Sequence, residues 1–354
     1  MKILLVANGN LKACGARYYS PAAKIFNGLI RNGHNALWLS DRDIARYRAP
    51  FGIRSLGVNA LNQHFLKTCQ NFKPDMVLLH HADLIQTETL AEARRSLPAL
   101  KIAQFNVDVI FREHNTKMLQ SKLGVVDATF ITTAGAGLKK FSNKHGFVSY
   151  IPNAVDASID WPKCHENSDQ EHDIFWAMRG HRDSYEGDFR RDVPLFIEQS
   201  GEVSIDYHGM NGKPEILDAR YYDKIANCKM GLNLNTIRDD GKNEDAGAED
   251  LYLYSSDRIS HYMGSGLLTF IRRGGNLEEM FAEDKEAVYF STKEEALEKA
   301  VKYKKDDKAR RKIATSGWKK SHQHLNERLV AEYIVESTFN PAHNGKYIWP
   351  TEKY

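Results

Sequence analysis

Short apolar runs recur along almost the whole chain, and stretches of mixed polarity separate them. In the first half the runs occupy residues 2–8, 35–41, 74–81, 101–110, 128–134 and 146–153. Each run has the length of one buried strand, whereas intervening stretches such as residues 22–33 have the period of a helix and close on Gly33. Such alternation is typical of a parallel sheet covered by helices, so it predicts an α/β protein.

The alternation is interrupted once and then resumes. Residues 156–172, DASIDWPKCHENSDQEH, are polar and irregular and include a proline, which is typical of a linker. Further strand candidates follow at residues 172–180, 203–210, 230–235, 267–273 and 287–291, and helical sequence dominates from residue 293. A length of 354 residues also suits two domains. We therefore predict domains at 1–155 and 173–335, a linker at 156–172 and a tail at 336–354.

Charge and composition exclude several classes of function. The hydrophobic fraction of 42% can fill two cores, and a net charge of +3 arises from nearly balanced bases and acids. That balance gives no support to nucleic-acid binding. The cysteines lie far apart, without the spacing of a zinc site or a disulfide framework, which indicates a reducing compartment. Since no apolar run is long enough for a signal peptide or a membrane span, we expect a cytoplasmic protein with at most peripheral membrane contact.

Candidate ligand-binding residues follow the predicted strands of the second half. Two doubly wound domains that face each other across a cleft bind ligands at the carboxyl ends of their strands. Arg179 and Gly180 come directly after the first strand of the second domain, where arginine can bind phosphate and glycine allows close approach. An ordinary turn with solvated arginine explains these two equally well. Asn235 ends another strand and is expected to face the same cleft.

The segment at residues 254–271, YSSDRISHYMGSGLLTFI, combines helix-start signals with a charged pair and a histidine. Ser256 and Asp257 are expected near the free N–H groups of a helix start, which favours anions. Arg258 would add a positive fork, and His261 could donate to a ribose or phosphate oxygen. Gly266 would let the helix approach the next strand. A capped surface helix with a partly buried histidine is the alternative for this segment.

These residues carry a resemblance to a known family. The second half resembles the donor domain of GT-B glycosyltransferases of the group-1 superfamily, which includes CgeB-like proteins; the matched positions are Asn235, Arg258, His261 and Gly266. The first half is similar to the acceptor domain of such enzymes. The resemblance implies two Rossmann-like domains, with C-terminal helices that return to the first domain. It also implies a nucleotide-sugar donor and a reaction without cofactor or metal. The implied acceptor is a glycan or a lipid-linked glycan in bacterial surface polysaccharide or lipopolysaccharide synthesis, and the implied location includes peripheral contact with the inner membrane surface.

The chain departs from this family pattern at one pair of positions. Retaining group-1 enzymes carry a Glu-x7-Glu pair, and here the two glutamates are replaced by Leu253 and His261. The donor nucleotide (UDP, GDP or CMP) and the stereochemistry therefore stay open. A nucleotide-sugar-binding protein without catalysis, or a sugar-nucleotide epimerase with the same architecture, remains an alternative to the transferase.

An inverting transfer also needs a base for the acceptor hydroxyl, and we expect it in the first domain. Asp108 follows a predicted strand and is the first candidate, although a helix cap or an ion pair with Arg112 is a close alternative. His81, at the end of an earlier strand, is the second candidate. Gly15, Arg17 and Tyr18 lie in the first strand-to-helix turn and are expected to touch acceptor or donor. No cluster of oxygen ligands has metal-site spacing, so we expect metal-independent transfer.

Overall fold

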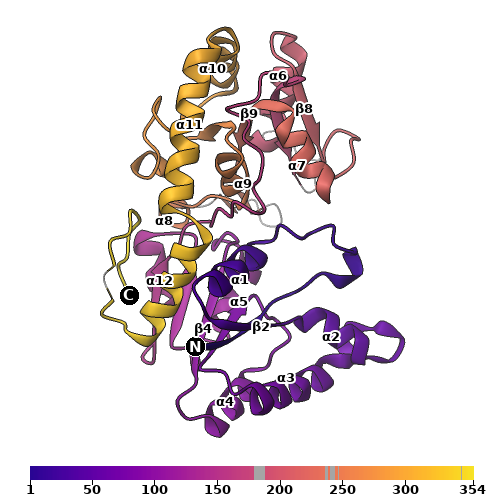
Figure 1. Cartoon of the computed structure of the whole chain (residues 1–354), viewed down its shortest axis with the longest axis vertical. Coiled ribbons are helices and arrows are strands. Elements are labelled where there is room, and N and C mark those ends of the chain that lie inside the picture. Colours follow the sequence, from indigo (N-terminus) through magenta and orange to yellow (C-terminus); the bar gives the residue numbers. More distant parts are fainter. Residues whose placement is uncertain (179–187, 236–237, 240–243, 246, 344) are drawn as a thin grey trace. The chain divides into compact units, whose positions relative to one another are not determined.

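The chain forms two compact units. A computed structural model describes residues 1–354 except 179–187, 236–237, 240–243, 246 and 344 (Figure 1). Unit 1 comprises Met1–Pro152 together with Glu327–Tyr354, and unit 2 comprises Asn153–Asn326. Each unit is an α/β domain with its own sheet, as the alternation of apolar runs predicts. The facing arrangement of the two units stays a prediction.

Unit 1 contains a parallel six-stranded sheet in the order β2-β1-β3-β4-β5-β6. The central strands are buried on both faces, which explains why their sequences are continuously apolar. The strands are β1 (Lys2–Val6), β2 (Asn35–Leu39), β3 (Met76–His80), β4 (Lys101–Asn106), β5 (Ala128–Ile131) and β6 (Phe147–Tyr150). All six coincide with the predicted runs.

Helices cover this sheet and connect its strands. They are α1 (Pro21–Arg31), α2 (Asp41–Arg48), α3 (Val58–Phe72), α4 (Thr87–Ser96), α5 (Glu113–Gln120) and α12 (Glu327–Phe339), with 3-10 turns at Leu11–Ala13, Pro50–Gly52, Arg54–Gly57 and Gly135–Phe141. Helix α1 begins where Ser20 accepts the N–H of Ala23 and Pro21 occupies the first helical position.

The last helix of the chain completes unit 1. Helix α12 packs along α1, and Arg31 forms an ion pair of 2.6 Å with Glu327 at its first turn. Gly28 permits this approach, because a Cβ atom there would lie 2.1 Å from the carbonyl oxygen of Glu327. The predicted return of the C-terminal helices to the first domain is confirmed for α12, whereas α10 (Lys293–Lys305) and α11 (Asp307–His324) belong to unit 2.

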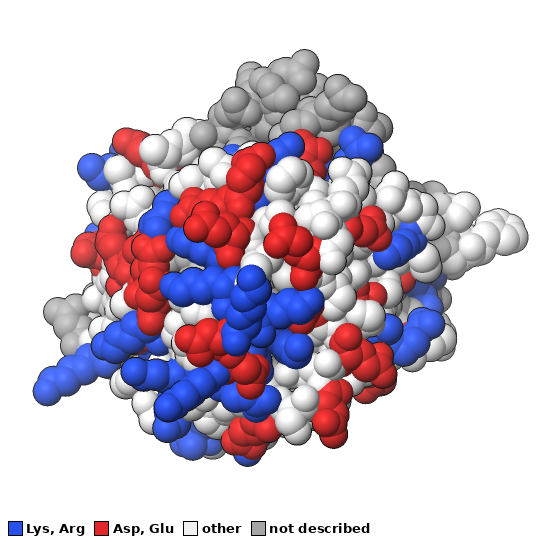
Figure 2. Space-filling model, turned by 90° about the horizontal axis from the view of Figure 1, so that it is seen from above, with Lys and Arg blue, Asp and Glu red and all other residues white. Residues whose placement is uncertain are grey.

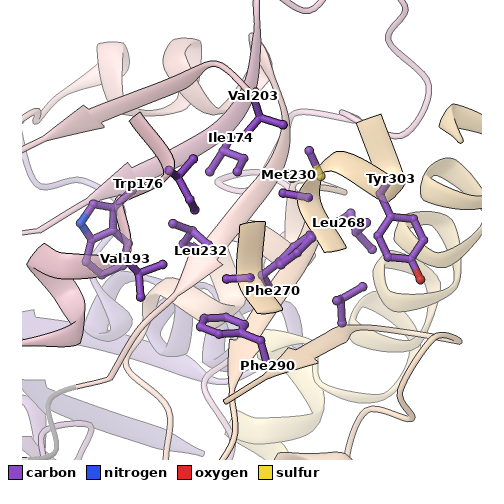
Figure 3. Packing of buried hydrophobic residues seen from close by; sticks show 14 of the residues in the cluster. Ile174, Trp176, Val193, Val203, Met230, Leu232, Leu268, Phe270, Phe290 and Tyr303 are labelled. Atoms are coloured by element: carbon purple, nitrogen blue, oxygen red, sulfur yellow. The ribbon is translucent and has the colours of Figure 1, made fainter. Parts of the chain in front are cut away.

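Unit 2 contains a parallel five-stranded sheet in the order β13-β12-β9-β7-β8. Its strands are β7 (His172–Ala177), β8 (Ile205–His208), β9 (Cys228–Asn233), β12 (Leu268–Arg272) and β13 (Val288–Phe290). The hydrophobic core gathers side chains from all five strands and from α6 (Phe189–Ser200), α10 and α11 (Figure 3). Trp176, Leu232 and Phe270 lie in this core, on three neighbouring strands.

Shorter elements complete unit 2. They are α7 (Ala219–Ala226), α8 (Ala248–Leu251), α9 (Arg258–Gly264), a 3-10 turn at Leu277–Glu279 and an antiparallel pair of β10 (Arg238–Asp239) with β11 (Glu244–Asp245). In the described part of the chain no helix has both the length and the apolar character of a membrane span. Cys14 is exposed, and Cys69, Cys164 and Cys228 are buried.

The predicted linker is an ordered part of unit 2, which corrects the domain boundaries. Asp156 and Asp160 are buried, and Asp160 accepts the backbone N–H of Asp156 at 2.8 Å. Further along the segment, the Gln170 amide donates to the carbonyl oxygens of Cys164 and Cys228. The polar residues that indicate a linker in the sequence therefore satisfy one another and the edge of the second sheet.

Candidate functional site

The order of the strands in unit 2 reverses direction at one point. The unit begins with β7, adds β8 on one side and then crosses to place β9 on the other side. Doubly wound sheets bind ligands at the carboxyl ends of the two strands that flank such a reversal. In unit 2 these ends are Ala177, the last residue of β7, and Leu234, which follows β9. We call this position the switch point of unit 2.

Arg258 lies at the switch point of unit 2. Its Nε donates to the carbonyl oxygen of Ala177 at 3.1 Å, and its Nη1 donates to that of Leu234 at 3.0 Å. The guanidinium carbon lies 4.3 Å from the centre of the Trp176 ring, a cation–π distance. The charge is thus held at the ends of both strands by partners that leave it unneutralised, which suits an anionic ligand.

Asn235 and Ser256 hold the loop after β9 against the segment that precedes α9. The Asn235 Oδ1 accepts the N–H of Ser256 at 3.0 Å, and its Nδ2 donates to the carbonyl oxygen of Tyr254 at 3.2 Å. The Ser256 Oγ is buried and has no hydrogen-bond partner among the described residues. Because a buried hydroxyl without a partner is costly, this oxygen is a candidate contact for a bound ligand.

The start of α9 differs from the expected cap. Asp257 occupies the N-cap position, but its side chain makes no capping hydrogen bond and is half exposed. The helix itself spans seven residues, from Arg258 to Gly264. The anion-favouring feature of this segment is therefore the Arg258 side chain, and of the roles open to Asp257 the helix cap is not the one seen.

His261 lies inside unit 2, in a cluster of polar side chains. Its Nδ1 is 2.5 Å from the Tyr222 hydroxyl and 3.3 Å from Asp160 Oδ1, and the Tyr222 hydroxyl donates to the same carboxylate oxygen at 2.6 Å. This arrangement places the Nδ1 proton toward Asp160 and Tyr222. The other ring nitrogen faces Asp257 at 3.9 Å. The buried position favours an orienting role over the predicted direct contact with a ribose or phosphate.

Gly266 lies apart from the other predicted donor-site residues. It precedes β12, so it is at the amino edge of the sheet, whereas Asn235 and Arg258 are at the carboxyl edge. Its backbone φ is +74°, and a Cβ atom would lie 2.2 Å from His165 Nδ1. The glycine is required by this turn and by the close approach of His165, which corrects its assignment to the donor site. The other two candidates, Arg179 and Gly180, lie outside the described residues.

Unit 1 has a switch point of the same kind. Its strand order reverses between β1 and β3, because β2 lies on one side of β1 and β3 on the other. The connection from β1 to α1 carries Gly15, Arg17 and Tyr18, so these predicted residues lie on the loop that leaves this edge. His81 directly follows β3. We call the position between the carboxyl ends of β1 and β3 the switch point of unit 1.

The backbone after β3 is strained. His81 and Ala82 have φ angles of +58° and +45°, which residues with a side chain rarely adopt in succession. The Ala82 N–H donates to the carbonyl oxygen of His80 at 2.7 Å, which closes a tight turn. Strain of this kind is concentrated at functional sites, where it aims a particular side chain.

The structure brings the two predicted base candidates together. His81 Nε2 lies 3.6 Å from Asp108 Oδ2, although β3 and β4 carry them on different connections. Burial lowers the pKa of His81, while the Asp108 carboxylate acts in the opposite direction. The neighbouring His80 ring stacks on Phe105 at 4.4 Å and contacts the His81 ring at 4.3 Å. A neutral imidazole beside a carboxylate can accept a proton.

Three residues at or near these sites are absent from the sequence-based prediction. Trp176 supports Arg258, and Asp160 and Tyr222 hold His261. Trp176 belongs to an apolar strand, whose pattern indicates burial and nothing more. Asp160 lies in the segment interpreted as a linker, so its contact with Tyr222 and His261 can be recognised only from the fold. No group of metal-ligating side chains is present among the residues described.

Comparisons with known proteins agree with this architecture. Residues 192–336 match the model of a family described as Glycosyl transferase-like. The match is a likeness over this part of the chain alone. It covers most of unit 2 and reaches into α12. No protein in a curated set matches the sequence.

Solved structures extend the likeness to nearly the whole chain. HepE from Anabaena, in complex with UDP-glucose, has a TM-score of 0.58 at 11% identity, with 95% of this chain and 99% of HepE covered. Sucrose-phosphate synthase from Thermosynechococcus elongatus has a TM-score of 0.59 at 8% identity, with 95% and 98% covered. A putative UDP-N-acetylglucosamine 2-epimerase from Listeria monocytogenes has a TM-score of 0.53 at 13% identity, with 97% of both chains covered. The fold is GT-B.

Proposed function

We propose that the protein is a glycosyltransferase that moves a sugar from a nucleotide-sugar donor to a glycan or lipid-linked acceptor. The observation that carries the proposal is Arg258, a charged side chain held at the switch point of unit 2. It lies in the part of the chain that matches the glycosyl transferase-like family. Nucleotide-sugar transfer needs a fixed positive charge for the donor phosphates and is a glycosyl transfer, the reaction that the family description names, so both observations support it.

In this proposal unit 2 binds the donor. As the glycosidic bond to the nucleotide breaks, negative charge grows on the leaving phosphate, and a fixed guanidinium stabilises it. Arg258 provides that charge, and the Ser256 Oγ can donate to a phosphate or sugar oxygen. Asp160 and Tyr222 fix the ring of His261, which orients the start of α9 through Asp257. Since HepE, which has the same fold, binds UDP-glucose, uridine diphosphate sugars are the first donors to test.

Unit 1 supplies the proton acceptor. His81 is held neutral near pH 7 because burial lowers its pKa, so its Nε2 can take the proton of an acceptor hydroxyl. The Asp108 carboxylate, 3.6 Å away, stabilises the imidazolium that results. The roles can also be exchanged, with Asp108 accepting the proton itself. In either case His81 and Asp108 act together as one pair.

The remaining parts of the proposal concern the setting of the reaction. Transfer proceeds without metal or cofactor, since Arg258 provides the charge that a metal would otherwise supply. The acceptor is a bacterial surface polysaccharide or lipopolysaccharide precursor, and the enzyme is cytoplasmic, with peripheral contact to the inner membrane. The family resemblance supports these assignments of acceptor and compartment.

A screen with labelled donors tests the proposal. The protein is incubated with UDP-, GDP- and CMP-sugars, with and without EDTA, and nucleotide release is measured. We expect one donor class to be hydrolysed slowly without acceptor, at the same rate in EDTA. Binding without turnover would favour the non-catalytic alternative. Conversion of the sugar to its epimer would favour an epimerase, a candidate that the fold of the Listeria protein keeps open.

A further inference from the structure

A turn in unit 1 exposes large apolar side chains to solvent. Helix α2 ends at Arg48, and residues 50–56 are all exposed before α3 begins. Phe51 is 97% exposed and Tyr47, in the last turn of α2, is 85% exposed. With Ile53 and Leu56, which are about half exposed, these residues form what we call the apolar tip. Figure 1 shows α2 and this turn at the edge of unit 1.

The backbone of the apolar tip is strained at its most exposed residue. Phe51 has φ 56° and ψ 16°, and Gly52 follows with φ 68°. The left-handed region suits glycine or asparagine and disfavours a bulky aromatic side chain. Phe51 gains no burial within the folded chain in return. Its apolar surface is therefore available to something outside the chain.

The sequence around the tip is basic throughout. Residues 44–74 contain no Asp or Glu, and they include Arg46, Arg48, Arg54, Lys67 and Lys73. A stretch of 31 residues thus carries more positive charge than the net +3 of the whole chain. Arg46 pairs with Asp43, but Arg48 and Arg54 form no ion pair within the described residues. Arg48 approaches His64 at 3.4 Å, and Arg54 acts on Asp83 only through space, so no salt bridge neutralises either charge among the described residues.

The lysine-rich helices of unit 2 behave differently. Lys299 pairs with Glu283 and Glu295, and Lys304 pairs with Asp173. Figure 2 shows the face at the top of Figure 1, where α10 lies. Lys and Arg side chains on this face are bordered by Asp and Glu. This mixture is typical of a solvated helix face. The lysine-rich helices are as basic in net charge as the tip, and what distinguishes the tip is the absence of acidic residues from its sequence.

A second exposed apolar side chain is tied to the same helix. Leu11, on the connection between β1 and α1, is 71% exposed. Its backbone N–H donates to Asp43 Oδ2 at 3.0 Å, in the first turn of α2. This hydrogen bond places the Leu11 backbone at the first turn of α2, while the tip lies at the other end of that helix.

We propose that the apolar tip inserts into the interfacial region of an anionic lipid bilayer. Aromatic and aliphatic side chains on a narrow exposed turn, with arginines that attract anionic headgroups, are the combination that binds this region. A protein partner of this site would need an acidic rim and a pocket for Phe51. The inference deepens the peripheral membrane contact named under the proposed function, and it can be tested without any transferase activity.

Vesicle binding tests the proposal. The full chain is sedimented with vesicles of phosphatidylcholine alone, or of phosphatidylcholine with 30% phosphatidylglycerol. We expect binding to the anionic vesicles and at least about tenfold weaker binding to the neutral ones. Phe51→Asn should lower the partition coefficient roughly tenfold, and Arg48→Gln about fivefold, the effect of one basic residue near an anionic surface. Matched controls are Trp161→Ser, an exposed aromatic residue of unit 2, and Lys312→Gln on α11, and both should bind as the wild type does.

Stability and size provide the remaining readouts. Because asparagine tolerates the left-handed region, Phe51→Asn should melt no lower than the wild type, so weaker vesicle binding cannot be ascribed to unfolding. Equal loss in Trp161→Ser or Lys312→Gln would overturn the proposal. So would the absence of vesicle binding together with a concentration-dependent dimer that Phe51→Asn abolishes, since that result would assign the tip to a second copy of the chain.

Discussion

At the residue scale, the contact between His81 and Asp108 leads to a test of coupled function. Asp108→Asn should reduce the chemical step by about 10²–10⁴-fold, because the amide cannot accept a proton or stabilise an imidazolium. His81→Gln should have an effect of similar size. If the two act as one pair, the double variant should be no slower than the slower single variant. Single-turnover rates with saturating donor measure this, and multiplied losses would contradict the pairing.

Asp41 provides a second prediction, on stability. Its carboxylate is buried, and burial raises its pKa to about 6, although the backbone N–H of Arg42 acts in the opposite direction. The folded state therefore binds this proton more tightly than the unfolded state does. The resulting stabilisation is complete below about pH 4 and is lost as the pH rises through about 6.

Asp41→Asn removes this dependence, because asparagine does not ionise. Denaturation with urea should show the variant more stable than the wild type by roughly 3 kcal/mol at pH 8, and by much less at pH 4. Asp75→Asn, at an exposed aspartate of the same unit, is a control without that gain. If the variant and the wild type have the same stability at both pH values, ionisation of Asp41 does not destabilise the folded protein, and the prediction is wrong.

Individual site residues could be predicted from the sequence to different degrees. His81, Asp108, Asn235 and Arg258 each follow or precede a recognisable strand, and the carboxyl-edge rule for parallel sheets gathers them at the switch points. What they contact could not be predicted. The partners of Arg258 are backbone carbonyl oxygens, which every residue has, and Asp160 reaches His261 from about 100 positions away in the chain.

At the scale of elements, the sequence predicts the strands better than the boundaries. Ten of the eleven strands of the two parallel sheets fall within predicted apolar runs, and β9 begins two residues before its run, because a strand buried on both faces leaves an unbroken apolar signature. The return of α12 to the first domain comes from the family resemblance, whereas the boundary drawn at residue 335 does not express it, since an amphipathic helix does not record which sheet it covers. The apolar face of α12 packs on α1, β4 and β5.

The packing of α12 on α1 can be tested at Gly28. A methyl group there would lie 2.1 Å from the Glu327 carbonyl oxygen, so Gly28→Ala should force the helices apart and cost at least ~2 kcal/mol of unfolding free energy. Without that contact the same change would stabilise α1 by ~1 kcal/mol, through helix propensity. The sign of the change in urea denaturation therefore decides. Gly124→Ala, where a Cβ meets nothing within 4 Å, should be nearly neutral.

At the scale of the whole molecule, the comparisons establish the fold but not the substrate. The GT-B architecture is shared with proteins that are only 8–13% identical and that differ in activity. The fold therefore does not choose the reaction. That choice depends on a few side chains at two switch points, and Arg258 is the one on which the proposal rests most.

The most direct measurement is UDP binding to unit 2, by calorimetry on the full chain. We predict that Arg258→Ala weakens UDP affinity about tenfold to a hundredfold, the loss of a charged hydrogen bond of ~1.5–3 kcal/mol. Since this variant also loses two hydrogen bonds to strand ends, it should melt earlier, and Arg258→Lys, which keeps the charge, should bind with intermediate affinity. Arg220→Ala, an exposed arginine paired with Asp218, should bind UDP as the wild type does. Wild-type affinity in a folded Arg258→Ala protein would contradict the account.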